Sequence, residues 1–151
     1  MQQNQKASIT GIGSYLPSKV LTNYDLEKMV DTSDDWIIQR TGIKERRIVE
    51  NGQITSDLAT YASLRAMEDA GVSPGDLDMI ITSTITPDHI FPSTSCYIQQ
   101  KIGASRASAF DILAACAGFI YALSVGESFV NSGAMKTVLV VGAECLSKIT
   151  D

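Results

Sequence analysis

Apolar residues in this chain form short continuous runs that alternate with stripes at helical spacing. Residues 78–86 and 136–142 are strongly apolar runs, typical of strands covered on both faces. Residues 56–70 carry apolar side chains at helical spacing, and Gly71 marks the end of that helix. Further strands are predicted at 7–16 and 107–112, and further helices at 23–30, 33–41, 92–102 and 118–130. This alternation predicts an α/β fold, with a mixed, mostly parallel sheet and helices on both of its faces.

The remaining segment between these elements, residues 43–53, is polar and predicts a loop or an edge hairpin. The chain has 151 residues, 44% of them hydrophobic, which suits a single packed domain. A net charge of −5 argues against nucleic-acid binding, since that requires a basic face. No apolar run approaches the roughly 20 residues of a membrane span, and residues 1–6 do not resemble a signal peptide.

The three cysteines, Cys96, Cys116 and Cys145, are widely spaced and form no CxxC pattern. Neither a disulfide framework nor a metal site is therefore expected, and Cys96 and Cys145 are interpreted as packed side chains. A reducing, cytoplasmic setting is the simplest interpretation of this cysteine usage.

Cys116 lies where a strand-like run meets a helix-like run, within the sequence FDILAACAGF at 110–119. A cysteine that opens a helix has its sulfur near unpaired N–H groups and the positive end of the helix dipole. Both favour the thiolate, which is the nucleophilic form. Ligands of parallel sheets bind at the carboxyl ends of strands, where Cys116 is expected. The pattern alone leaves two interpretations open: a catalytic nucleophile, or an inert buried cysteine.

Trp36, the only tryptophan, and Arg40 are four residues apart and share one face of the predicted helix 33–41. An indole beside a guanidinium can hold a flat heterocycle that carries phosphate. The alternative is a helix whose tryptophan packs in the core while the arginine is solvated. His89 is interpreted as a loop or interface residue rather than as a base for Cys116. Residues 44–47 are interpreted as a solvated charged face that could help to receive an acidic partner.

The chain closely resembles the N-terminal half of β-ketoacyl-acyl carrier protein synthase III, from about residue 8 to residue 151. The motifs that carry this resemblance are GIGSYLP (11–17), DTSDDWIIQRTGI (31–43), HIFPS (89–93), FDILAACAGF (110–119), YALSV (121–125) and LVVGAE (139–144). The resemblance implies a thiolase-like fold, in which two similar halves form an α-β-α-β-α sandwich, usually in a homodimer. Residues 1–151 would be the N-terminal half-domain, and the C-terminal half would be missing.

The implied activity is an acyl transfer that starts fatty-acid synthesis. The cysteine matching Cys116 takes the acyl group of a short acyl-CoA, typically acetyl-CoA. It then condenses this group with malonyl-acyl carrier protein to give a 3-oxoacyl product and carbon dioxide. Backbone N–H groups, including that of the cysteine, would hold the oxyanion. Coenzyme A thioester is a substrate here, and no cofactor or metal is implied.

The resemblance also assigns substrate-binding residues. Trp36 matches a residue that stacks on adenine, Arg40 one near the adenine and phosphates, and Thr32 one that contacts the base. Phe91 matches a residue that limits the acyl pocket across the dimer interface, and Leu146 matches a pocket-lining position. Family members are roughly twice as long, and their catalytic histidine and asparagine belong to the C-terminal half, so His89 takes neither role.

Residues 117–130 are apolar around most of the predicted helix, so an isolated chain should expose an apolar patch. We therefore expect the chain to be part of a larger assembly and to lack full activity alone. Three alternatives stay open: a polyketide starter synthase, a non-enzymatic CoA-binding or partner-pairing fragment, and an inactive structural fragment.

Overall fold

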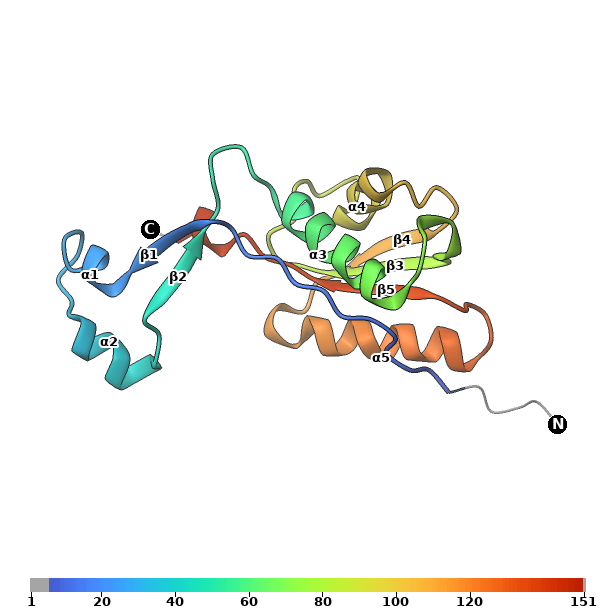
Figure 1. The fold of residues 1–151 in the computed structure, drawn as a ribbon, viewed down its shortest axis with the longest axis horizontal. Helices are drawn as coiled ribbons and strands as arrows, with labels where there is room; N and C mark the ends of the chain where they lie inside the picture. The colour runs from blue at the N-terminus through green and yellow to red at the C-terminus, as the bar shows by residue number, and fades with distance from the viewer. Residues whose placement is uncertain (1–5, 151) are drawn as a thin grey trace. The chain divides into compact units, whose positions relative to one another are not determined.

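The computed structural model describes residues 6–150, which divide into two compact units. The first unit comprises residues 6–15 and 54–145, and the second comprises residues 16–53 and 146–150. Figure 1 shows the elements of both units. Each unit is described by itself below.

The first unit is built on a parallel sheet. Its strands in the described residues are β3 (Met79–Ser83), β4 (Ser108–Ile112) and β5 (Val138–Gly142). They lie in the order β4-β3-β5, with β3 parallel to both neighbours. All five residues of the central strand β3 are buried, as its continuous apolar sequence predicts.

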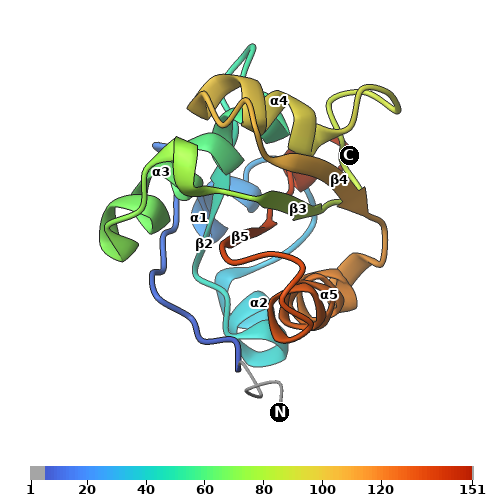
Figure 2. The same cartoon turned by 90° about the vertical axis from the view of Figure 1, so that its right-hand side faces the viewer.

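Helices cover both faces of this sheet. They are α3 (Thr55–Ala70), α4 (Thr94–Ile102) and α5 (Gly118–Asn131), with a 3₁₀ turn at Pro74–Asp76 before β3. Figure 2 shows α3 and α4 on one side of the strands and α5 on the other. The crossovers β3-α4-β4 and β4-α5-β5 run in opposite directions across the sheet, so right-handed connections place α4 and α5 on opposite faces. The predicted α/β fold is thus confirmed.

Two apolar clusters form the core, one on each side of the sheet. Ile80 of β3 packs with Met67 and Ile98 beneath α3 and α4. Its neighbour Ile81 packs on the other side with Ala122 and Phe129 of α5. This alternation follows from the two-residue repeat of side-chain direction in a strand.

The predicted strand at 7–16 is wrong, because residues 6–17 are extended but belong to neither sheet. The segment instead lies on α3: a Cβ on Gly11 or Gly13 would overlap the main chain of that helix. Its backbone binds side chains, with Ala7 N–H donating to Asn131 Oδ1 and Ile12 N–H donating to Asp69 Oδ2. Close contact with a helix therefore takes the place of strand pairing.

The second unit contains a two-stranded antiparallel ribbon, β1 (Lys19–Thr22) and β2 (Glu45–Ile48), and two short helices, α1 (Asn23–Leu26) and α2 (Asp34–Thr41). A further 3₁₀ turn spans Leu146–Lys148. The segment 43–53, predicted as a loop or an edge hairpin, contains the single strand β2, which pairs with β1 and not within the segment; β1 itself was not predicted. The predicted helix 23–30 is too long: its cap is Thr22, in a capping box with Asp25, and the α-helix ends at Leu26.

Asp78 ties the start of β3 to the start of β5 and makes stability depend on pH. Its carboxylate accepts hydrogen bonds from the N–H groups of Lys136 (2.7 Å) and Thr137 (3.0 Å). These two hydrogen bonds lower the pKa of Asp78 from its usual value of 3.8, and the bond from Thr137 has the larger effect. A lowered folded-state pKa means that this stabilisation is present above about pH 4 and is lost as the pH falls through the folded pKa.

We expect Asp78→Asn to lower the free energy of unfolding by roughly 1 kcal/mol at neutral pH, because the amide replaces a charged acceptor. As the pH falls below about 4 and through the folded pKa, the difference should shrink, since the native carboxylate becomes protonated as well. Urea denaturation across this pH range measures the difference, with Asp31→Asn as an exposed control. A difference that stays constant with pH would contradict the role given to the charge.

Candidate active site

The carboxyl ends of the three parallel strands meet at one edge of the sheet. Ser83 at the end of β3 lies opposite both Ile112 of β4 and Gly142 of β5. The segment after β3 carries Phe91, and the segment after β4 carries Cys116. The sheet therefore brings both segments to the edge at which ligands bind in parallel α/β folds.

Cys116 is exposed and lies on a sharp turn between β4 and α5. Ala115, immediately before it, has a φ of 45°, a left-handed conformation that costs about 1–2 kcal/mol for a residue with a Cβ. Cys116 is the middle residue of the 3₁₀ turn Ala115–Ala117, and α5 begins two residues after it, at Gly118. Cys116 therefore lies in the turn before α5 and, contrary to the prediction, does not open the helix itself. Its exposure does not fit the alternative interpretation of an inert buried cysteine.

Gly118 allows α5 to begin close to the end of β3. A Cβ at this position would overlap Ser83 Oγ, and Ser83 is itself buried. The turn that carries Cys116 is thus held between the strand that precedes it and the neighbouring strand. Only glycine fits this approach without displacing one of them.

Glu144, just after β5, holds the beginning of the loop that leads to Phe91. Its carboxylate accepts from the N–H groups of Ile85 (2.8 Å) and Thr86 (3.0 Å) and from the hydroxyl of Thr84 (3.1 Å). The Thr86 hydroxyl donates to the same carboxylate and accepts from Cys145 N–H. Sequence analysis missed Glu144, since only its position after an apolar strand could have drawn attention to it.

The far end of the same loop is held by Asp111 of β4. Its carboxylate accepts from the N–H groups of Thr94 (2.6 Å) and Ser95 (2.8 Å), which open α4. Between these two attachments, Ile90 and Phe91 expose 99% and 87% of their surface. Two almost fully exposed apolar side chains on an anchored loop are typical of a surface that contacts another molecule.

His89 lies on this loop, exposed, with its ring 5.6 Å from that of Tyr97. This placement agrees with the interpretation of a loop or interface residue. Of the other cysteines, Cys145 is buried and Cys96 is partly buried, and all three are free thiols.

In the second unit, Trp36 and Arg40 lie on one face of α2, as predicted. The guanidinium carbon of Arg40 lies 4.8 Å from the centre of the Trp36 ring, and Trp36 is 54% exposed. Ile37 is the residue that α2 buries, so the alternative of a core tryptophan does not hold. The predicted limits of α2 are confirmed by Ser33, its N-cap, and by Gly42, left-handed at its end.

Two further predicted site residues also belong to the second unit. Thr32 is partly buried just before α2, and Leu146, half-exposed, begins the 3₁₀ turn Leu146–Lys148. The roles given to both residues stay predictions.

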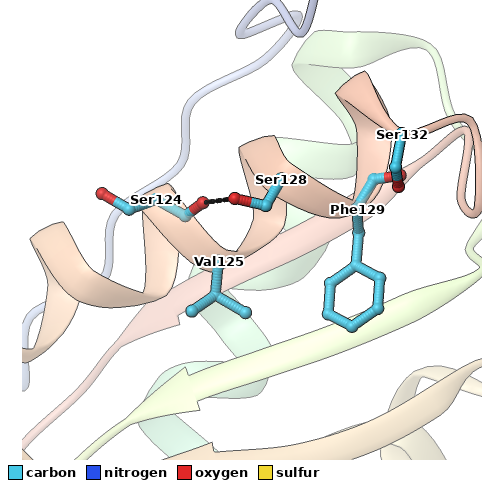
Figure 3. Close-up of a pocket in the computed structure, with 5 residues that line it drawn as sticks. All are labelled: Ser124, Val125, Ser128, Phe129 and Ser132. Carbon is cyan, nitrogen blue, oxygen red and sulfur yellow. Dashed lines mark hydrogen bonds between the residues drawn. The ribbon is translucent and has the colours of Figure 1, made fainter.

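An open hollow lies along α5, and none of the predicted site residues lines it. It is lined by Ser124, Val125, Ser128, Phe129 and Ser132, and Ser128 Oγ donates to the Ser124 carbonyl (Figure 3). Towards the start of α5, Phe119, Ile120 and Tyr121 are also substantially exposed. The expected exposure of apolar side chains on this helix is therefore observed.

Among the described residues 6–150, no helix is both long and apolar enough to cross a membrane. No group of histidine, cysteine, aspartate and glutamate side chains in that range is arranged to hold a metal ion.

Known proteins with this arrangement are thiolase-like condensing enzymes. The chain superimposes on 3-oxoacyl-[acyl-carrier-protein] synthase III from Aquifex aeolicus with a TM-score of 0.92 and 55% identity, over 95% of this chain and 46% of that one. It superimposes equally well, with a TM-score of 0.93 and 37% identity, on the priming β-ketosynthase of the R1128 polyketide pathway, over 100% of this chain and 46% of that one.

Sequence comparison identifies the family within this class of enzymes. Residues 110–151 match the model of 3-oxoacyl-[acyl-carrier-protein] synthase III. The chain is 63% identical over 143 residues to the β-ketoacyl-[acyl-carrier-protein] synthase III of Caldanaerobacter subterraneus and 58% identical over 151 residues to that of Xanthomonas campestris. The chain therefore belongs to the β-ketoacyl-[acyl-carrier-protein] synthase III family. It corresponds to the N-terminal half, spanning 43% and 46% of these two relatives.

Proposed function

We propose that this chain carries the acyl-accepting part of a β-ketoacyl-acyl carrier protein synthase III. The observation that supports this most directly is the exposed Cys116, directly after the left-handed Ala115, at the carboxyl edge of the sheet. The matched family segment, residues 110–151, contains this turn. An exposed thiol on a rigid turn can be approached by a thioester without rearrangement of the backbone.

In the first proposed step, the Cys116 thiolate attacks the carbonyl carbon of acetyl-CoA. A carbon–sulfur bond forms to Cys116, the bond to the CoA sulfur breaks, and CoA leaves as a thiolate that takes up a proton. Cys116 lies at the start of the 3₁₀ turn, where the first N–H groups have no partner within the turn, so its own N–H can face the oxyanion.

In the second proposed step, malonyl-acyl carrier protein loses carbon dioxide and its carbanion attacks the acyl group on Cys116. A carbon–carbon bond forms, the 3-oxoacyl-acyl carrier protein leaves, and Cys116 returns as a thiolate. The decarboxylation is assigned to groups of a C-terminal half, as the family resemblance implies, and no residue of this chain is given that role.

The same proposal includes the partners and the setting. It places the enzyme in a homodimer, in which the exposed Ile90 and Phe91 of one protomer meet the acyl pocket of the other. A reducing, cytoplasmic location is consistent with three free thiols. The proposal names no cofactor, since CoA thioester acts as a substrate.

CoA binding is assigned to the face of α2 that carries Trp36 and Arg40. We expect CoA to quench Trp36 fluorescence, because adenine stacks on the exposed indole while Arg40 contacts a phosphate. Arg40→Gln should weaken CoA binding about tenfold, which is about 1.4 kcal/mol. Fluorescence titration of the 151-residue chain measures this, with Arg106→Gln as the matched control.

Pantetheine, which lacks the nucleotide, should not quench Trp36. Equal affinity for CoA in the native chain and in Arg40→Gln would contradict the assignment of phosphate binding to Arg40. Quenching by CoA without any acylation of Cys116 would favour a non-enzymatic binding module instead.

A polyketide starter synthase is the second candidate, because the R1128 priming β-ketosynthase shares the fold at 37% identity. The two candidates differ in the acyl chain that they accept. The acyl-CoA profile of Cys116 labelling separates them: a preference for acetyl-CoA supports the fatty-acid enzyme, and a preference for long acyl chains supports the alternative.

A further inference from the structure

Asn23 is a fully buried side chain at the centre of the second unit. Its Nδ2 donates to Asp34 Oδ1 (2.8 Å) and to the carbonyl of Ile43 (2.7 Å), and its Oδ1 accepts from Arg46 Nη2 (2.8 Å). Its backbone N–H donates to the carbonyl of Lys44 (3.2 Å). The side chain is 0% exposed, so these hydrogen bonds are shielded from water and hold the neighbouring groups in place.

The partners of Asn23 lie at both ends of one helix. Asp34 is the first residue of α2, and Ile43 directly follows Gly42, which ends it. A single side chain therefore holds the start and the end of α2, and Trp36 and Arg40 lie between these two points.

The same network joins α2 to the rest of its unit. The N–H of Asp34 donates to Glu27 Oε1 (2.7 Å), just after α1. Arg46 of β2 donates through Nη1 to the carbonyl of Leu21 in β1 (3.2 Å). Rotation or sliding of α2 would break the bonds from Asn23 Nδ2 to both ends of the helix and the bond from Asp34 to Glu27 at once.

We propose that Asn23 is a positioning residue for the Trp36–Arg40 pair. Its side-chain hydrogen bonds go to Asp34, Ile43 and Arg46, so it acts by fixing the helix that presents the pair. The proposal rests on the proposed function where it concerns CoA binding, but the geometry of the pair can be measured without any ligand.

Only an asparagine satisfies these neighbours, because the position needs two donors and one acceptor on a short side chain. In Asn23→Asp, an isosteric change, the second oxygen would face Asp34 Oδ1 and the Ile43 carbonyl, which are both acceptors. The double variant Asn23→Asp/Asp34→Asn returns a donor opposite residue 23 and should restore part of the arrangement.

The experiment measures the tryptophan band of the near-ultraviolet circular dichroism spectrum and the affinity for CoA by Trp36 fluorescence. Trp36 is the only tryptophan, so the band reports on this helix alone. The proteins compared are the native chain, Asn23→Asp, the double variant, and Asn51→Asp as an exposed control.

We expect Asn23→Asp to lose most of the tryptophan band and at least about tenfold in CoA affinity, with recovery of the band in the double variant. If Asn23→Asp unfolds the second unit, refolding in the double variant supports the proposal and its absence overturns it. An unchanged tryptophan band and affinity in folded Asn23→Asp also overturns it. If native protein fails to bind CoA while Asn23→Asp still loses the band, the positioning role stands and the proposed CoA site fails.

Discussion

Replacement of Cys116 by alanine should abolish the transfer of radiolabelled acetyl groups from acetyl-CoA to this chain. Cys116 is the exposed thiol on the turn after β4, whereas Cys145 is buried and Cys96 is partly buried. Without the sulfur no carbon–sulfur bond can form at this edge, so the loss should be complete rather than partial. Labelling is measured with the 151-residue chain alone and with the chain mixed with the C-terminal half of a synthase III relative.

Two controls make this result specific. Cys96→Ala should retain the label, since Cys96 accepts a hydrogen bond from Ser93 at the start of α4 and lies off the turn. Reaction with iodoacetamide should be lost in Cys116→Ala as well, which locates the exposed thiol independently of CoA. Label that persists in Cys116→Ala would contradict the proposed first step. So would a native chain that takes up no label either alone or together with the C-terminal half.

Replacement of Gly118 by alanine should destabilise the first unit although alanine is the better helix former. The new methyl group would overlap Ser83 Oγ, so α5 or β3 must shift. Overpacking of this kind costs about 1–3 kcal/mol and outweighs the gain of up to about 1 kcal/mol in helix propensity. We expect a fall in melting temperature of several degrees, on the order of 2–4 °C per kcal/mol, and slower acetylation of Cys116.

A matched pair of variants separates the steric cause from other effects. Gly118→Ala/Ser83→Ala removes the overlapping oxygen and should recover part of the stability and of the labelling rate. Gly75→Ala should behave like the native chain, because its Cβ would meet only Ser73 Oγ at 3.9 Å. Stability lost equally in Gly75→Ala would show that the approach of α5 to β3 is not the cause.

The apolar pattern predicted the first unit well because most of its elements bury residues at regular spacing. The all-buried β3 and the helices that end at Gly71 and Gly103 follow from local sequence. The limits of α2 also follow from local sequence, because its N-cap Ser33 and its C-terminal Gly42 can be recognised without knowledge of tertiary contacts. Exposure of Trp36 could not be predicted, since nearby Ile37 and Ile38 would fit either orientation of the helix.

Prediction failed where distant contacts decide the local structure. The alternating residues 7–16 are typical of a strand, but Gly11 and Gly13 allow the chain to lie directly on α3. The left-handed Ala115 is also invisible in sequence, because alanine gives no signal for that conformation. The hydrogen bonds of Glu144 to residues 84–86 span about sixty positions, beyond the reach of any local pattern.

The two carboxylates that hold the loop from residue 84 to residue 95 affect how much entropy binding would cost. Glu144 fixes its beginning and Asp111 fixes its end, so only the few residues around Ile90 and Phe91 lie beyond these attachments. Ordering one backbone residue costs about 1–2 kcal/mol, so a loop free along its whole length would lose far more on insertion into another surface. This loop has already met most of that cost during folding, so burial of its two exposed apolar side chains in another surface would cost less entropy.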